Sequence, residues 1–95
     1  MFAVLGQWVM DPGRSEAQDR ELTERIVPAV RETAGFVEAR WTRHADRRRH
    51  VSFILFEDEP SATAFASWVR EQDGPRRDAG VANDSLEIYE VVASA

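Results

Sequence analysis

The alternation of apolar and polar positions along the chain predicts four strands and two helices. Residues 51–56, Val-Ser-Phe-Ile-Leu-Phe, form the most apolar stretch, and successive side chains of a strand point to opposite faces. Because this stretch is apolar on both faces, we expect a central strand covered on both sides. Residues 2–10 show the same double-sided pattern and predict a second buried strand.

Two further strands and a loop follow from the same reasoning. The side chains of residues 36–44 alternate between an apolar face and a polar face, as in an edge strand. Residues 85–93 alternate again and predict the last strand. Residues 73–84 contain two glycines, a proline and mixed charges, so we expect a loop with the freedom to act as a lid.

Helix signals lie between these strands. Residues 16–33 place apolar side chains on one helical stripe, and Ser15 and Gln18 have the spacing of a capping box. Pro28 is expected to kink the last turns of this helix. A second helix is predicted from residue 58 or 59 to residue 72, with Pro60 in its first turn.

The resulting order of strand, helix, strand, strand, helix, strand predicts an α+β, ferredoxin-like βαββαβ fold with a four-stranded antiparallel sheet and two helices on one face. Two helices of these lengths cover only one side of such a sheet. Residues 2–10 and 51–56 are nevertheless apolar on both sides. We therefore expect a homodimer in which a twofold-related copy covers the other side.

Composition narrows the class of protein. The 95 residues fit one domain, residues 1–95, and the net charge of −5 disfavours a nucleic-acid or anionic-membrane binder. The chain has no cysteine, which excludes disulfides and thiolate sites and is typical of a cytoplasmic protein. No apolar run approaches the roughly 20 residues of a membrane span. Two histidines without a carboxylate at ligand spacing disfavour a metal site.

With Ala34-Gly35-Phe36-Val37 before the second strand and Ala64-Phe65-Ala66-Ser67-Trp68 in the second helix, the chain resembles the dimeric α+β barrel proteins, and among them the antibiotic biosynthesis monooxygenase-like group. The resemblance implies a ligand cavity between helices and sheet in each subunit. The superfamily includes cofactor-free oxygenases of aromatic polyketides, haem-degrading enzymes, lactone isomerases and members without a known reaction, so the fold alone does not fix the function.

The chain shares some residues with the haem-degrading branch of this group but departs from it at an essential position. Gln7 stands where that branch carries Asn, and Trp68 matches its helix Trp. That branch also needs a haem-ligating His shortly after the Trp, and residues 69–84 contain none. Arg76 and Arg77 lie there instead, and a guanidinium does not ligate iron.

Four side chains are candidates for catalysis. Gln7 is the strongly polar side chain of the first strand and could polarise a carbonyl or hold an oxyanion, or simply bond to backbone. Trp68 could stack on a flat substrate or pack in the core. Tyr89 could share a proton with a phenol or be a core residue, and His44 is preferred over His50 as a general base, although both could be solvent-exposed hairpin residues.

Other aromatic residues are expected to bind the substrate or to form an interface. By strand parity Trp8 points away from Gln7, and we assign it to the dimer interface. The predicted substrate-binding residues are Trp41, Phe53, Phe56 and Phe65.

The resemblance favours a monooxygenase-like protein that binds a small hydrophobic, flat aromatic molecule such as a polyketide or quinol, and that as an enzyme would be a cofactor-independent oxygenase. The expected mechanism needs no cofactor, because the deprotonated substrate itself reduces dioxygen. The alternative is a non-catalytic homodimeric ligand-binding or interaction module whose cavity is filled by Phe53, Phe56 and Phe65. A third hypothesis is an isomerase or cyclase that moves protons without oxygen.

Overall fold

The computed structural model describes all residues, 1–95, and contains one antiparallel sheet. Its strands are β1 (Phe2–Met10), β2 (Phe36–Arg43), β3 (Arg49–Phe56) and β4 (Val81–Glu90), in the spatial order β2-β3-β1-β4. The two strands predicted to be central are central, and the strand predicted to lie at an edge does so. The predicted ferredoxin-like α+β fold is confirmed.

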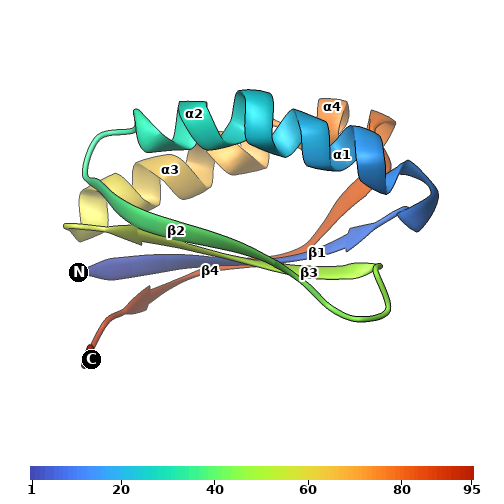
Figure 1. Ribbon diagram of the computed structural model, residues 1–95. Coiled ribbons are helices and arrows are strands. Elements are labelled where there is room, and N and C mark those ends of the chain that lie inside the picture. The colour runs from blue at the N-terminus through green and yellow to red at the C-terminus, as the bar shows by residue number, and fades with distance from the viewer.

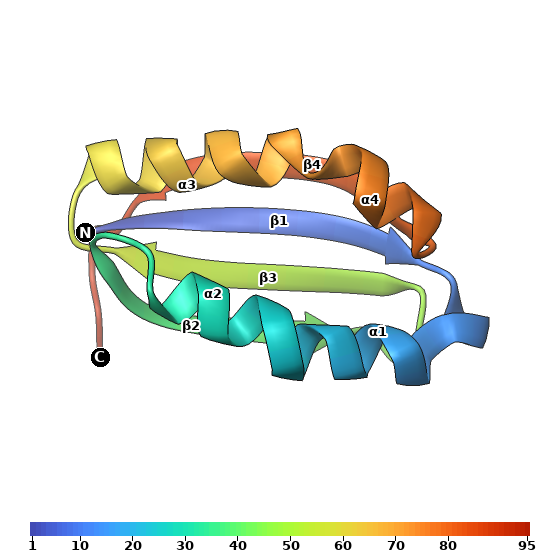
Figure 2. The same ribbon diagram turned by 90° about the horizontal axis from the view of Figure 1, so that it is seen from above.

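All helices lie over one face of the sheet, and the other face is bare (Figure 1). The helices are α1 (Ser15–Glu21), α2 (Val27–Arg31), α3 (Glu59–Glu71) and α4 (Asp73–Asp78). In the view from above, α1 and α2 run along β2 and β3, while α3 and α4 run along β1 and β4 (Figure 2). The sheet therefore has a helix-facing side and a bare side.

The first helical segment is interrupted just before its proline. A π-helical turn, Leu22–Ile26, separates α1 from α2, and the N–H of Val27 bonds to the carbonyl of Leu22, five residues back. Pro28 has no N–H to continue a regular ladder, and its ring crowds the preceding turn. The irregularity expected at Pro28 thus takes the form of one wider turn.

The predicted capping box is wrong. The Ser15 hydroxyl donates to the carbonyl of Pro12 at 2.8 Å, and the Asp11 carboxylate accepts from the N–H of Gly13 at 2.9 Å. The buried Gln18 amide instead donates to the carbonyl of Ala79 at 3.1 Å. This bond ties α1 to the turn that enters β4.

The predicted lid loop is also wrong. Residues 73–78 form α4, and β4 begins at Val81 and not at residue 85. Asp73 forms ion pairs with Arg76 and Arg77 at i+3 and i+4, which favours a helical turn. Gly80, at φ +78°, then reverses the chain into the strand.

The core lies between the helices and the sheet. Phe56 on β3 is fully buried, and its ring centroid lies 5.1 Å from that of Phe65 on α3. Buried aliphatic side chains complete this core: Val4, Val30, Ile54, Ala62, Ala66 and Val69.

The bare side has an apolar centre and polar edges. Because Val4, Ile54 and Phe56 face the helices, the alternate positions of β1 and β3 face the other way. These positions are Ala3, Leu5, Gln7 and Val9 on β1 and Val51, Phe53 and Leu55 on β3. Val9 and Val51 are 45% and 42% exposed. The expected apolar surface on this side is present along the two central strands at Leu5, Val9, Val51 and Phe53, whereas Ala3 and Leu55 are already buried within the chain.

Gly35, between α2 and β2, offers a local test of this packing. Its φ is +77°, and a Cβ there would lie 2.4 Å from the Ser61 hydroxyl oxygen. We expect Gly35→Ala to lower the free energy of unfolding by about 1–3 kcal/mol, because it adds backbone strain and a clash. Chemical denaturation measures this, with Gly74→Ala as the matched control, since nothing lies within 4 Å of a Cβ at Gly74. Equal stability of the two variants would contradict the expectation.

Candidate ligand site on the helix-facing side

Aromatic side chains from four elements gather on the helix-facing side of the sheet. Trp8 on β1 and Trp41 on β2 are half-buried against the core. Trp68 on α3 is 39% exposed, and its ring centroid lies 5.9 Å from that of Phe65. With Phe36, Phe56 and Phe65 they form what we call the aromatic layer.

Trp8 is held in place by one hydrogen bond. Its indole N–H donates to the Ser52 hydroxyl at 2.9 Å, and Ser52 is only 4% exposed. The indole crosses Gly6, where a Cβ would lie 2.6 Å from the indole nitrogen. Trp41 pairs with Ser52 from the other neighbouring strand. The two tryptophans thus flank one buried hydroxyl group, and a side chain at Gly6 would remove this arrangement.

A partly buried guanidinium lies against the same indole. The Arg76 guanidinium carbon is 4.8 Å from the centroid of the Trp8 ring, which is cation–π distance. The Arg76 side chain is only 15% exposed. Burial lowers the pKa of this guanidinium, although Asp73 opposes the shift. The site therefore combines a stacking surface with a positive charge.

His50 is the titratable group that sequence reasoning undervalued. It pairs across the sheet with Trp8 on β1 and with Arg43 on β2, and it shares the helix-facing parity of Ser52. Burial and the nearby charge of Arg43 lower the pKa of His50 below its usual 6.5, against smaller opposing effects of a hydrogen bond with the Arg47 backbone and of the Asp19 charge. Its imidazole is therefore largely neutral at pH 7 and able to accept a proton. Once β3 is known to begin at Arg49, strand parity places His50 on the helix-facing side.

Gln7 and Trp8 lie on the faces opposite to those expected. The parity prediction is correct, but Trp8 faces the helices while Gln7 is exposed on the bare side. Gln7 and Trp68 therefore cannot bound one cavity of a single chain. Both faces of β1 are apolar, so the pattern alone could not tell which of them the helices cover.

Tyr89 and Phe53 also lie on the bare side, away from the aromatic layer. Tyr89 pairs with Ala3 and is 51% exposed, and its hydroxyl donates to the Glu87 carboxylate at 2.6 Å. This hydrogen bond and the charge of Glu87 raise the pKa of Tyr89, which keeps the phenol protonated. Phe53 pairs with Leu5 and Arg40 on the same side. Seven of the eight predicted site residues are thus divided between the two faces, and the eighth, His44, lies in the hairpin between β2 and β3.

A small hollow marks the bare side. Its volume is about 60 Å³, too small for a ligand of several rings. Its lining residues are Leu5, Gln7, Val51, Ser85, Glu87 and Tyr89.

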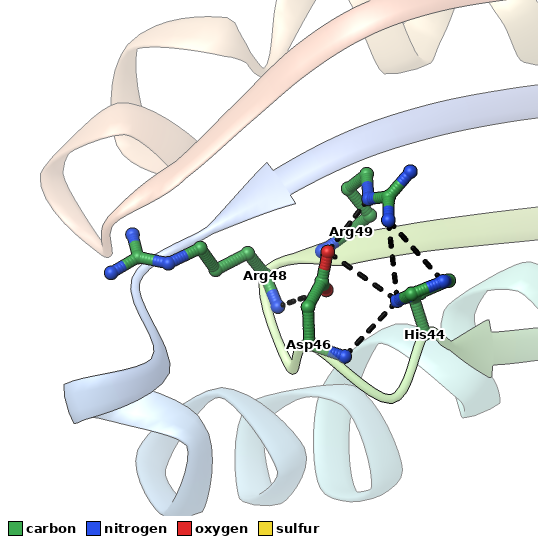
Figure 3. A network of polar contacts seen from close by, with 4 residues as sticks. All are labelled: His44, Asp46, Arg48 and Arg49. Carbon is green, nitrogen blue, oxygen red and sulfur yellow. Dashed lines mark hydrogen bonds and ion pairs between the residues drawn. The ribbon is translucent and has the colours of Figure 1, made fainter.

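His44 belongs to a polar network in the β2–β3 hairpin (Figure 3). Its Nδ1 accepts from the N–H of Asp46 at 3.0 Å, and the Arg49 guanidinium lies 3.2 Å from its Nε2. The Asp46 carboxylate accepts from the backbone N–H of Arg49, from its guanidinium and from the N–H of Arg48, which lowers the pKa of Asp46. His44 is therefore an exposed hairpin residue outside the aromatic layer.

A second hollow lies beside the aromatic layer, between α2 and the edge strand β2. Its volume is about 300 Å³, near the lower end of the range of small-molecule sites. Trp41 is shared by this hollow and the aromatic layer. The hollow is lined by Val27, Arg31, Phe36, Val37, Glu38, Ala39, Arg40 and Trp41.

No group of three or more His, Asp or Glu side chains is arranged to hold a metal ion. No helix has the length and apolar character needed to cross a membrane.

The chain shares its fold with solved structures that include a monooxygenase, a putative antibiotic biosynthesis monooxygenase and a heme degrader, in agreement with the fold that the resemblance implied. No family model and no curated protein sequence matches the chain. Solved structures do. The heme-degrader MhuD of Mycobacterium tuberculosis, with two hemes bound in its active site, is 18% identical with a TM-score of 0.78, and the match covers 100% of this chain and 99% of MhuD.

Two oxygenases of Streptomyces share the fold. The monooxygenase ActVA-Orf6 of S. coelicolor, in complex with nanaomycin D, is 15% identical with a TM-score of 0.71 over 99% of this chain and 89% of its own. SnoaB of S. nogalater, a cofactor-independent oxygenase, is 13% identical with a TM-score of 0.72. The match covers 98% of this chain and 94% of SnoaB. Identities this low establish the fold and not the activity.

Proposed function

We propose that the protein binds a flat aromatic small molecule against the aromatic layer and oxidises it with dioxygen, without a cofactor. The observation that carries this proposal is the position of the three tryptophans. All belong to the helix-facing aromatic layer, they come from three different elements, and none is fully buried. Indole faces that remain accessible can stack on a planar ligand.

The similar structures support the class of reaction. ActVA-Orf6 was solved with nanaomycin D, and SnoaB is a cofactor-independent oxygenase. An aromatic substrate with an acidic C–H₂ or O–H group would suit such chemistry here.

His50 supplies the base in this mechanism. Its neutral imidazole takes a proton from the bound substrate, and the resulting electron-rich anion is oxidised by dioxygen. For an activated CH₂ group, one oxygen atom of dioxygen becomes the carbonyl oxygen and the other leaves as water with the two hydrogens. Trp8 and Trp68 hold the ring plane, and the apolar surroundings exclude bulk water.

The role of His50 can be tested by substitution. With anthrone as substrate, we expect His50→Gln to lower kcat by about 100-fold or more, the usual contribution of a general base. In the wild type, kcat should fall as the pH drops below a midpoint under 6.5, because the lowered pKa of His50 keeps the base neutral down to that pH. Oxygen uptake measures both effects.

His44→Gln is the matched control and should retain wild-type kcat, since His44 lies in the exposed hairpin. A His50→Gln variant with unchanged kcat and an unchanged pH profile would exclude His50 as the base.

The assembly that we propose is a homodimer formed through the bare side of the sheet. Its apolar centre along β1 and β3 suits contact with a second copy, because exposed apolar surface of this kind is rare on a monomer. Glu38 and Arg40 on β2 and Glu87 on β4 would form the polar rim. A twofold interface of this kind leaves the aromatic layer free in each subunit.

A non-catalytic binding module is the second candidate, and one observation favours it. Phe56 and Phe65 fill the centre of the helix-facing side, with exposures of 0% and 5%. Binding of an aromatic compound without oxygen consumption would support the module and exclude the oxygenase.

A further inference from the structure

The positive charge next to Trp8 is only partly compensated. The NH1 nitrogen of Arg76 lies 3.6 Å from the Asp73 carboxylate, and the same carboxylate forms a closer contact of 2.8 Å with Arg77. Asp73 is the one acidic side chain within 4 Å of the Arg76 guanidinium. The Asp73 carboxylate thus forms ion pairs with two guanidiniums. The less exposed of the two, that of Arg76, makes the longer contact.

The Arg76 guanidinium also has N–H groups that donate no hydrogen bond within the protein. A guanidinium has five N–H donors. One nitrogen, NH2, donates to the carbonyl of Val69, and NH1 makes only the long ion pair with Asp73. No buried side-chain nitrogen or oxygen of the protein lacks a partner. Nε and NH1 of Arg76, which donate no hydrogen bond within the protein, are therefore not fully buried.

The position of this charge is fixed by its contacts. The stacked Trp8 indole and the bond to Val69 hold the guanidinium at the edge of the aromatic layer. A planar guanidinium with free donors pairs with a carboxylate through two parallel hydrogen bonds. The edge of the adjoining indole, whose face the guanidinium covers, would at the same time contact the ring of the same ligand.

We propose that Arg76 selects the ligand by binding its oxyanion, and that the preferred ligands are flat aromatic carboxylates. This inference rests on the proposed function for the aromatic ring itself and adds the charge of the ligand. Arg76 is then a specificity-determining residue.

Two probes of nearly equal shape separate ring binding from anion binding. Calorimetric titration of the full chain at pH 7 compares 2-naphthoate with its neutral counterpart 2-naphthamide. We expect naphthoate to bind at least about tenfold more tightly, as a charge-assisted hydrogen bond would require. Raising the salt concentration should weaken naphthoate binding and leave naphthamide binding unchanged.

Arg76→Met should bind the two probes equally, and Arg76→Lys should keep part of the preference, since lysine keeps the charge without the planar fork. Arg77→Met is the matched control, because Arg77 contacts the same Asp73 but is 73% exposed. It should keep the wild-type preference.

The outcomes distinguish the two proposals. Equal binding of both probes to the wild type would leave the aromatic site standing and exclude anion recognition by Arg76. Binding of neither probe would exclude the aromatic site, and the inference about Arg76 would fall with it. A preference that persists in Arg76→Met would place the anion site elsewhere.

Discussion

Leu5→Asp is expected to break the proposed homodimer into monomers. Leu5 lies on the bare side at the centre of β1, between Phe53 on β3 and Glu87 on β4. In the proposed dimer the new carboxylate would be desolvated beside Glu87, and the two copies would bring like charges together. An unpaired buried charge costs about 3 kcal/mol or more, so the dimer dissociation constant should rise by about 100-fold.

Sedimentation velocity over a range of micromolar concentrations measures this change. Thr63→Asp is the control, because Thr63 is an exposed residue of α3 on the opposite side of the molecule, and it should remain dimeric. A wild-type chain that is monomeric over the same range, or a Leu5→Asp variant that dimerises normally, would exclude the proposed interface. A native far-UV circular dichroism spectrum of Leu5→Asp verifies that the subunit still folds.

The largest expected loss of stability is that of Phe56→Ala. Phe56 is fully buried, and its ring packs on Phe65 at a centroid distance of 5.1 Å. Removing a buried phenylalanine ring loses transfer free energy and leaves a cavity, which together cost about 3–5 kcal/mol. For a chain of this size, such a loss lowers the melting temperature by more than about 12 °C.

Urea denaturation at one fixed protein concentration measures this loss, since dissociation would otherwise contribute to the apparent stability. Phe56→Leu keeps most of the side-chain volume and should lose less than about half as much. A Phe56→Ala variant within about 1 kcal/mol of the wild type would show that this packing does not hold the helices on the sheet.

The sequence was sufficient to predict the sheet but not to predict which of its two faces the helices cover. Alternation along residues 51–56 predicts a strand apolar on both faces, and the structure places that strand at the centre. Parity correctly separates Gln7 from Trp8. It does not say which of them faces the helices, because Leu5 and Val4 are equally suited to a core.

The remaining errors have similar local causes. Gly74 and Pro75 predicted a loop, but Asp73 and its two arginine partners favour a helical turn, and this turn brings Arg76 onto Trp8. The predicted strand begins at residue 51, so His50 falls just outside it, whereas β3 begins at Arg49. No pattern within the sequence could show that a residue of the supposed lid stacks on a residue of the first strand.

The arrangement of the tryptophans also gives the protein an intrinsic optical probe. Its three indoles belong to the helix-facing aromatic layer, and the bare side carries none. Emission excited at the red edge of the indole absorption band should therefore respond to occupancy of the layer and remain insensitive to assembly. Ligand binding could thus be followed without any attached dye.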